Sequence, residues 1–473
     1  MINIRLLAAF AIALLFCTSP GALAQETWDG GHSSSNAWFA NVNWLDDTAP
    51  VDFDSLIFTG TARLNHNSYA DLGGGDNDFD ITGITFDAAA GAFVINNGGG
   101  PAGSTIKLHG DIANDSSNLQ TMNFHFQLDS GNRTIHTNTS DMVIGGIISE
   151  DGSARGLTKD GAATLTLSAA NTYTGATTIQ EGKVVFTNQN AFGTGQITLG
   201  IESNVNQTIE FGANGLNLSN NMFIQNSIGK KTIRLDLAGT NTGTLSGNVH
   251  VREDNNDPEG LDFDIGTNDT LTVSGNIFAD SVAGNAEVTK IGDGTLALTG
   301  TNAYKGITTV DAGQLSLEGS LTSDVFVGSG TTLATQTATV ASTTKDIDLL
   351  AGSIGEFTLF GAGGVRGTDY SAWDATNFDF GNVTINLIED TAGLGLTLVA
   401  GDEFDLLNWT GNFTLTGTTS FSMLPALATG LKWDTSRWST EGVLFVAVPE
   451  PGAAMLLCFG AGAFLLRRRR QSC

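Results

Sequence analysis

The chain has 473 residues, of which 49 are acidic and 21 are lysine or arginine, and its net charge at neutral pH is −28. A field of this sign repels nucleic acid and anionic lipid, so nucleic-acid binding is excluded as the main role. Only 15% of the residues are charged and 60 are glycine, a composition that favours β-turns and strand ladders over amphipathic helices.

The first 24 residues have the organisation of an export signal. Arg5 gives a basic start, an apolar run covers residues 6–16, and three small residues precede Gln25. The apolar run is too short to span a bilayer, which takes about 20 residues. We therefore predict a signal peptide over residues 1–24, removed by signal peptidase between Ala24 and Gln25. The alternative is a buried N-terminal helix.

A β-rich N-terminal cap is predicted over residues 25–100. Trp28, Trp38 and Trp44 lie in it, four further tryptophans lie near the other end of the chain, and the long middle section has none. Stacked repeats need special end coils to cover their exposed core and edge strands, and bulky aromatic side chains at both ends suit such caps. The alternative is that exposed tryptophan faces stack on sugars.

Two segments of the body, residues 157–186 and 288–317, align without gaps at an offset of 131 residues. A lysine, two turn glycines, a Thr-Leu-x-Leu run, an Asn-x-Tyr-x-Gly run and a Thr-Thr pair recur in register. The alternation in residues 164–167 places the leucines on one face of a short strand, and glycines separate the strands. Because each coil of such a chain buries its apolar face only against another coil, we predict a right-handed parallel β-helix, or β-solenoid, over residues 101–340. A stack of separate β-sandwiches is the alternative.

These recurring residues resemble the autotransporter-associated β-strand repeat, which is found in parallel β-helical passenger proteins of bacterial surfaces. The resemblance is strong over both segments and weaker between them. It implies an exported protein that is displayed on the cell surface.

The sequence gives no positive sign of catalysis in the body. Lys159 and Lys290 recur within the repeat, so we expect a structural role at a turn rather than a catalytic one. The six histidines show no metal-ligand spacing, and no Gly-x-Ser-x-Gly elbow marks a nucleophile. All three cysteines lie in the two ends of the chain, so the body has neither disulfides nor thiolate metal ligands. We predict no catalytic residues, no resident metal and no cofactor.

Calcium is the one ion for which the sequence offers candidate ligands. Residues 73–80 and 253–259 concentrate carboxylate and amide oxygens in loops marked by glycine or proline. Neither loop fits the EF-hand pattern, and the first lacks the spacing of calcium-binding nonapeptide repeats. We favour solvated polar turns over calcium sites.

A second β-rich region is predicted over residues 341–447. Its alternating runs, residues 357–360 and 383–387, suggest strands that close the structure in a sandwich-like arrangement. Helix should be nearly confined to the two terminal segments.

The last segment, residues 448–473, carries three features in sequence: Pro449-Glu450-Pro451, an apolar run over residues 452–466, and four arginines. Moving the arginines through hydrocarbon costs several kcal/mol each, so we predict a transmembrane helix held by Arg467, Arg468, Arg469 and Arg470. The apolar run is marginal in length, and snorkelling of the arginine stems would help it to span. The alternative is a buried C-terminal helix with a basic tail.

This three-part tail resembles the PEP-CTERM sorting signal of Gram-negative bacteria. The resemblance implies that Pro449, Glu450 and Pro451 are the residues recognised by exosortase, a membrane protease-transpeptidase, and that Arg467 to Arg470 anchor the precursor on the cytoplasmic side. The inner membrane would hold the chain transiently before processing.

Taken together, the sequence predicts an exported structural or adhesive protein of the cell surface or extracellular matrix, without enzymatic turnover. Its expected partners are signal peptidase and exosortase during export, and extracellular polysaccharide afterwards. The competing hypothesis is a carbohydrate-binding or carbohydrate-cleaving β-helix. A groove with three or more carboxylates beside an arginine or lysine would favour cleavage, and coplanar solvent-facing tryptophans would favour binding.

Overall fold

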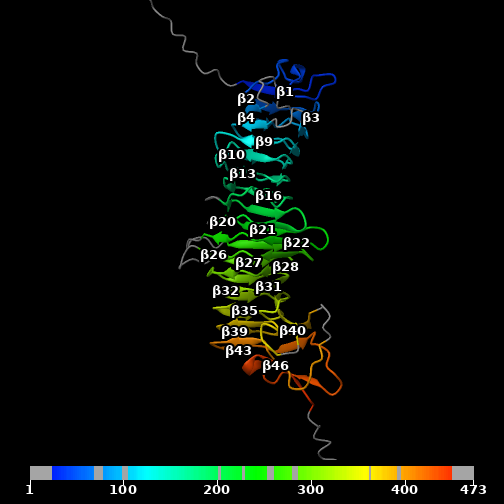
Figure 1. Ribbon diagram of the computed structural model, residues 1–473, viewed down its shortest axis with the longest axis vertical. Coiled ribbons are helices and arrows are strands. Elements are labelled where there is room, and N and C mark those ends of the chain that lie inside the picture. Colours follow the sequence, from blue (N-terminus) through cyan, green and yellow to red (C-terminus); the bar gives the residue numbers. More distant parts are fainter. Residues whose placement is uncertain are drawn as a thin grey trace, which may run out of the picture.

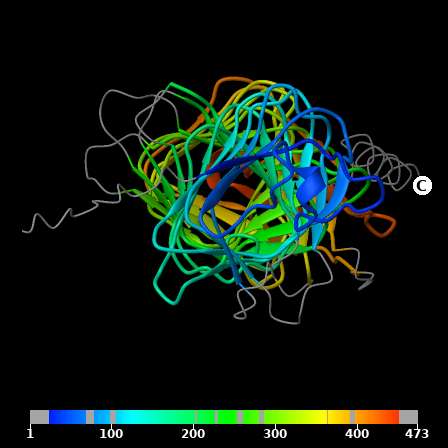
Figure 2. The same cartoon turned by 90° about the horizontal axis from the view of Figure 1, so that it is seen from above.

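The computed structural model describes residues 24–68, 78–97, 105–200, 204–225, 229–252, 260–279, 286–361, 364–390 and 396–449. Within these residues the chain forms one long rod of short, stacked strands (Figure 1). Seen along the long axis, the coils lie over one another around a common centre (Figure 2). The all-β class and the long parallel sheets agree with the predicted parallel β-solenoid.

Four parallel sheets form the sides of the rod, and in each of them successive coils contribute neighbouring strands. Sheet A has 14 strands: β1 (Gln25–Trp28), β2 (Asp54–Phe58), β4 (Asp78–Phe86), β6 (Thr105–Leu108), β7 (Ile112–Asn114), β9 (Phe126–Leu128), β10 (Arg133–Thr137), β12 (Ile148–Glu150), β13 (Leu157–Asp160), β15 (Thr177–Ile179), β17 (Ile197–Leu199), β20 (Met222–Ile224), β23 (Val249–Val251) and β26 (Ile277–Ala279).

Sheet B runs along almost the whole rod and has 15 strands: β3 (Asn65–Ser68), β5 (Val94–Asn97), β8 (Gln120–Met122), β11 (Met142–Ile144), β14 (Thr164–Leu167), β16 (Gly182–Phe186), β18 (Gln207–Phe211), β21 (Lys231–Leu235), β24 (Leu261–Ile265), β27 (Val288–Ile291), β30 (Thr308–Val310), β33 (Val325–Val327), β36 (Asp346–Leu349), β39 (Asn377–Phe380) and β43 (Phe413–Leu415).

Two shorter parallel sheets complete the sides. Sheet C has nine strands: β19 (Leu216–Leu218), β22 (Thr242–Leu245), β25 (Thr270–Val273), β28 (Thr295–Leu298), β31 (Gln314–Leu317), β34 (Thr332–Thr335), β37 (Ile354–Leu359), β40 (Val383–Glu389) and β44 (Thr419–Ser422). Sheet D has five: β29 (Thr301–Asn302), β32 (Ser320–Leu321), β35 (Val340–Thr343), β38 (Ala372–Ala375) and β42 (Leu407–Trp409). A parallel bridge between Phe278 and Ala303 joins the end of sheet A to the start of sheet D.

The coils differ widely in length although their strands stay in register. Thr308 pairs with Val325 in the next coil, 17 residues later, whereas Val383 pairs with Thr419, 36 residues later. The additional residues lie in the connections between strands, where insertions are tolerated because they leave the ladder intact. Register is therefore kept by the strands and not by a fixed repeat length.

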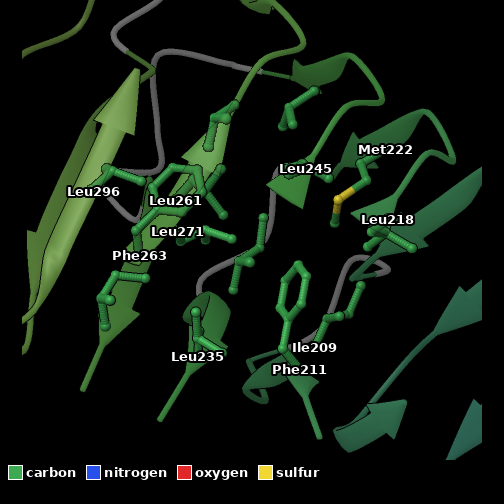
Figure 3. Close-up of a cluster of buried hydrophobic side chains, with 14 of the residues drawn as sticks. Ile209, Phe211, Leu218, Met222, Leu235, Leu245, Leu261, Phe263, Leu271 and Leu296 are labelled. Atoms are coloured by element: carbon green, nitrogen blue, oxygen red, sulfur yellow. The ribbon is translucent and has the colours of Figure 1, made fainter. Parts of the chain in front are cut away.

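Side chains alternate between the inside and the outside of the rod, as period-two strands require. In β18 and β24 every second residue is buried, and the residues between them are half-exposed. The inward side chains of successive coils pack into one continuous apolar core, in which Ile209, Phe211, Leu235 and Phe263 are fully buried (Figure 3).

Both copies of the sequence repeat form two stacked levels of the rod. In the first copy β13 pairs with β15 and β14 with β16, and in the second copy β27 pairs with β30 and β28 with β31. The first copy occupies sheets A and B, whereas the second occupies sheets B and C. Equivalent strands of the two copies therefore lie in different sheets: the first strand of the repeat is in sheet A in the first copy and in sheet B in the second.

Three tryptophans pack together at the N-terminal end of the rod. Trp28, Trp38 and Trp44 are fully buried, and the rings of Trp28 and Trp44 meet edge-to-face at a centroid distance of 5.3 Å. A short 3-10 helix, η1 (Asn41–Asn43), lies beside them. The Trp38 indole donates a 3.0 Å hydrogen bond to Nδ1 of His66, and burial lowers the pKa of His66 to about 3, so this histidine is a neutral acceptor.

The C-terminal region departs from the predicted sandwich-like closure. Residues 357–360 and 383–387 fall mainly in β37 and β40, which pair in parallel and in register, and the solenoid continues through β44. The alternating pattern of an in-register coil is the same as that of a sandwich strand, so periodicity alone could not separate them. Closure comes from a small antiparallel sheet, here sheet E, of β41 (Glu403–Asp405), β45 (Lys432–Asp434) and β46 (Val443–Ala447), together with helix α1 (Trp438–Glu441).

Among the described residues, no helix has the length and apolarity needed to cross a membrane. The two segments predicted as terminal helices, residues 1–23 and 450–473, lie outside the described part of the chain.

Candidate functional site

The predicted processing and sorting residues lie at the margins of the described structure. β1 begins at Gln25, and the carbonyl of Ala24 accepts a 3.0 Å hydrogen bond from the backbone of Ser55. Pro449 is exposed and follows β46 by two residues. Glu450, Pro451 and the arginines 467–470 lie outside the described residues, so the sorting motif remains a prediction.

The two repeat lysines are buried and bind backbone carbonyls. Nζ of Lys159 donates to the carbonyls of Asp160, Gly161 and Glu181 at 3.1, 2.6 and 3.0 Å. Nζ of Lys290 makes the equivalent bonds to Ile291, Gly292 and Ala312 at 2.8, 2.6 and 3.2 Å. An ammonium has three donors, so each lysine closes two adjacent turns of the rod. This is the structural role at a turn that the sequence predicted.

The repeat's Asn-x-Tyr signature is also directed into the core. The hydroxyls of Tyr173 and Thr177 lie 2.7 Å apart, and those of Tyr304 and Thr308 are also 2.7 Å apart. All four side chains are buried. Burial raises the pKa of Tyr173 to well above its usual range and that of Tyr304 to about 12. These tyrosines and threonines, which recur in both copies of the repeat, thus hydrogen-bond within the core and are not accessible to a ligand.

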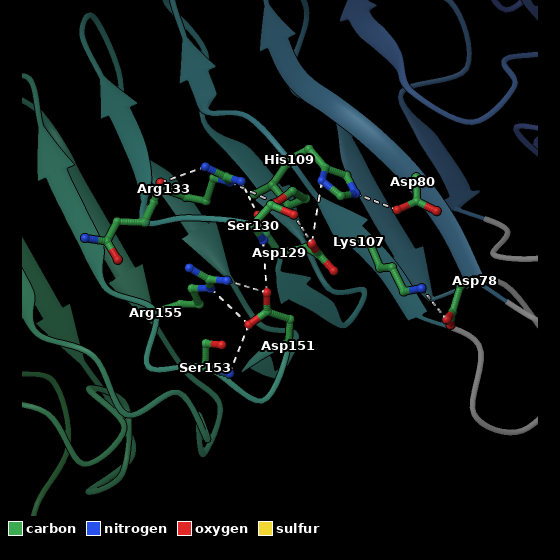
Figure 4. Close-up of polar contacts among 12 residues, drawn as sticks. Asp78, Asp80, Lys107, His109, Asp129, Ser130, Arg133, Asp151, Ser153 and Arg155 are labelled. Atoms are coloured by element: carbon green, nitrogen blue, oxygen red, sulfur yellow. Dashed lines mark hydrogen bonds and ion pairs between the residues drawn. The ribbon is translucent and has the colours of Figure 1, made fainter.

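A row of charges follows one edge of sheet A near the N-terminal end (Figure 4). His109 lies between two carboxylates, 2.5 Å from Asp80 and 3.7 Å from Asp129. Arg155 holds Asp151 at 2.7 Å, and this hydrogen bond keeps the pKa of Asp151 far below its usual value. Two bonds of this row cross between coils, from His109 to Asp80 and from the Ser130 backbone to Asp151, so the row ties neighbouring coils together.

A second set of acids gathers on sheet B without such compensation. Asp348 on β36 is in register with Asp379 on β39, and Asp346 and Asp324 lie near it. Burial, followed by repulsion from these three neighbours, raises the pKa of Asp348 to about 6. Like charges in register on adjacent strands destabilise a sheet.

The calcium hypothesis finds no support in the described residues. Loop 253–259 and most of loop 73–80 lie outside them, and Asp78 and Asp80 form ion pairs with Lys107 and His109. Within the described ranges, no three His, Cys, Asp or Glu side chains are grouped so that they could hold a metal ion.

A cavity of about 460 Å³ opens where the last coil meets sheet E. Its apolar lining comes from Leu407 and Val443, which are buried, and from the half-buried ring of Trp409. Gly442 follows α1 in a left-handed conformation (φ +70°), and a Cβ added there would lie 3.1 Å from the Trp409 ring and 2.6 Å from Leu407. Glycine therefore allows the chain to pass directly against the indole.

The polar lining of the cavity consists of Asn408, one arginine and three carboxylates, the composition expected above of a carbohydrate-cleaving groove. The reducing-end assay described under the proposed function tests that alternative. Nη1 of Arg437 lies 2.7 Å from Glu403, and its Nε donates to Glu441 at 2.6 Å. The third carboxylate, Asp405, has a pKa raised by burial and partly restored by Arg366. Its backbone is fixed, because its N–H donates to the Tyr370 hydroxyl at 3.1 Å and its carbonyl accepts from Arg366 at 2.9 Å.

None of the cavity's polar residues was predicted from the sequence, although Trp409 is one of the four tryptophans near the C-terminal end. Of the seven tryptophans in the chain, Trp28, Trp38, Trp44, Trp373 and Trp438 are buried, and Trp409 and Trp433 are half-buried. The five buried rings suit caps and cannot stack on sugars, so only Trp409 and Trp433 are left for that alternative. The charged residues of the cavity are spread over 39 positions of the sequence and come together only in the folded chain: Glu403, Asp405, Arg437 and Glu441. No local sequence pattern therefore predicts them as a group.

Comparisons with known proteins locate the chain's similarity in its middle. Residues 157–186 and 288–317 match the passenger-associated-transport-repeat family, which confirms the resemblance inferred from those two segments. A stretch of 57 residues is 40% identical to the "Extracellular serine protease" of Serratia marcescens, covering 12% of this chain and 6% of that protein. The chain is therefore a β-rich, parallel-stranded protein that carries two passenger-associated-transport repeats.

Proposed function

We propose that this protein is an exported structural and adhesive rod of the bacterial surface or extracellular matrix, delivered through the PEP-CTERM tail and acting without turnover. One observation carries the proposal: the residues that define the repeat, Lys159, Tyr173, Lys290 and Tyr304, are buried and bonded within the rod. They serve assembly, as expected of a scaffold.

Two further features support export. The passenger-associated-transport repeat points to a secreted β-helical protein, and the relative from Serratia marcescens is named as extracellular. Among the described residues, the first strand begins at Gln25, the first residue expected after signal cleavage, and the last strand ends at Ala447, two residues before Pro449. The described strands thus lie between the two predicted processing segments.

The route is tested by expressing an epitope-tagged chain in a host with and without exosortase. We expect a full-length, membrane-retained form without the enzyme and a shortened, surface or extracellular form with it. The variant Pro449→Ala/Glu450→Ala/Pro451→Ala should stay membrane-retained in both hosts. Equal size and location of the wild type in both hosts would contradict the sorting proposal.

The absence of turnover is tested separately by incubating the purified chain with extracellular polysaccharide from its host. We expect no new reducing ends over hours, because the lysines and tyrosines that recur in the repeat are buried in bonds within the rod. Steady release of reducing ends, abolished by Asp405→Asn, would instead support a carbohydrate-cleaving protein.

A further inference from the structure

We propose that the cavity between the last coil and sheet E binds an uncharged pyranose residue of an extracellular polysaccharide. The inference deepens the proposed adhesive role, and it rests on that role for its biological meaning. The binding itself depends only on the geometry of the cavity.

The cavity has the size and the mixed lining of a small-ligand site. Its volume of about 460 Å³ lies within the range typical of such pockets, and its apolar wall faces a few fixed polar groups. A pyranose ring has the same division, with C–H groups on its faces and hydroxyls around its edge. The chemistry of the cavity is therefore complementary to a sugar ring.

Trp409 supplies a rigid aromatic surface. Its ring packs against Phe413 at a centroid distance of 5.3 Å and meets Phe378 edge-on at 6.2 Å. These contacts hold one part of the indole while another part lines the cavity. An aromatic ring that is already ordered loses little conformational entropy when a ligand stacks on it.

The charges of the lining select against acidic sugars. Arg437 is engaged by both Glu403 and Glu441, so it is not free to pair with a ligand carboxylate. With Asp405 included, three acids and one base face the cavity, and the whole chain carries a net charge of −28. Carboxylate oxygens and the Asn408 side chain accept hydrogen bonds from hydroxyls, whereas a uronate or a sulfated sugar would be repelled.

The test titrates the full chain, purified in detergent, with four tetrasaccharides in a calorimeter: a neutral β-glucan fragment, N-acetylated chitotetraose, deacetylated chitotetraose and tetragalacturonate. We expect one of the two neutral sugars to bind and tetragalacturonate not to bind. Preferential binding of tetragalacturonate, binding of the amine-bearing sugar alone, or binding of none would overturn the proposal.

Variants assign the binding to the cavity. Trp409→Ala should weaken binding of the neutral sugar by about tenfold, the scale of one lost aromatic contact. Glu441→Gln should weaken it less and leave the fold intact, because Glu441 is half-exposed. Matched controls are Trp433→Ala, which lies outside the cavity against Phe404, and Glu389→Gln at the exposed end of β40. Unchanged binding in both cavity variants would refute the assignment, and none of these outcomes depends on the sorting route.

Discussion

The buried lysines show how a charge can serve a rod of this kind. Lys159 and Lys290 are inaccessible to solvent, and burial lowers the pKa of each from its ordinary value of 10.5 to about 8. At neutral pH both remain protonated, because their pKa is still above 7, and all three donors of each ammonium are matched by carbonyls.

This shift predicts an unusual rise of stability in alkali. Between pH 8 and 10.5 the unfolded chain holds protons on these lysines that the folded chain has released, so the free energy of unfolding increases with pH in that window, by at most about 1.4 kcal/mol per pH unit for each lysine. Below pH 8 the cost of burying the charge is present in full. Denaturant titrations of the wild type and of Lys159→Met/Lys290→Met measure this effect. From pH 8 to 10 the free energy of unfolding of the wild type should rise relative to that of the variant. If the difference in the free energy of unfolding between wild type and variant did not change with pH, the lowered pKa of the two lysines would be contradicted.

Gly182 illustrates a position where the repeat permits one residue type only. It has φ +74°, and a Cβ there would lie 2.5 Å from the carbonyl oxygen of Gly161 and 2.8 Å from those of Ala162 and Ala163. Gly215 has the same φ of +74° but open space around it. The pair separates backbone strain from steric clash.

We expect Gly215→Ala to destabilise the protein by about 1 kcal/mol, the cost of a left-handed conformation. Gly182→Ala should cost clearly more, about 3 kcal/mol or above, because the backbone of the preceding coil must also move. Thermal or denaturant unfolding measures both. Equal effects of the two substitutions would show that the turn relaxes easily.

At the scale of a strand, neighbouring coils determine whether an outward charge stabilises or destabilises. On sheet B, Arg234 lies 3.2 Å from Asp264 in the next coil, whereas Asp348 is in register with another acid, Asp379. The same residue type on the same sheet therefore has opposite effects.

Asp348→Asn should stabilise the protein above pH 6. The pKa of Asp348 is raised to about 6 from 3.8, so the folded state binds the extra proton between these values, and stability falls as the pH rises through that window. The gain at pH 7 should stay below about 1 kcal/mol because the carboxyl is partly solvated, and it should vanish near pH 4. The matched change Asp264→Asn, which removes a paired acid, should give no gain at pH 7. Melting temperatures of the wild type and both variants at pH 4 and 7 test this prediction. An Asp348→Asn variant no more stable than the wild type at pH 7 would contradict it.

The strands of the repeat were readable from the sequence because Thr164–Leu167 alternates cleanly and its flanking glycines mark the turns. The register between coils was not readable, because coil lengths of 17 to 36 residues remove any fixed period. The C-terminal cavity escaped prediction for a related reason: its aromatic wall comes from β42, whereas two of its acids come from β41 and one from α1. Only closure of the rod by an antiparallel sheet brings them together.

At the scale of the molecule, a rod in which each coil contacts mainly its neighbours should transmit damage only locally. Leu245→Ala in β22 removes a fully buried side chain from the middle of the rod and should cost about 2–5 kcal/mol. Hydrogen exchange followed by mass spectrometry should show lost protection in β19, β22 and β25 and retained protection in β5 and β40. Thr244→Ala, on the outward side of the same strand, is the control. Uniform loss along the chain would indicate a single cooperative unit.

The direction of the backbone hydrogen bonds gives the rod a mechanical character. In sheet B, fifteen strands spaced by about 4.8 Å span about 67 Å, and the bonds between them run along the rod's length. Tension applied between the two ends is therefore parallel to these hydrogen bonds. It separates one strand pair at a time and does not load many pairs at once in shear. A rod pulled from its two ends would therefore yield in small steps, each step releasing one coil's worth of chain, and would so dissipate the applied force gradually.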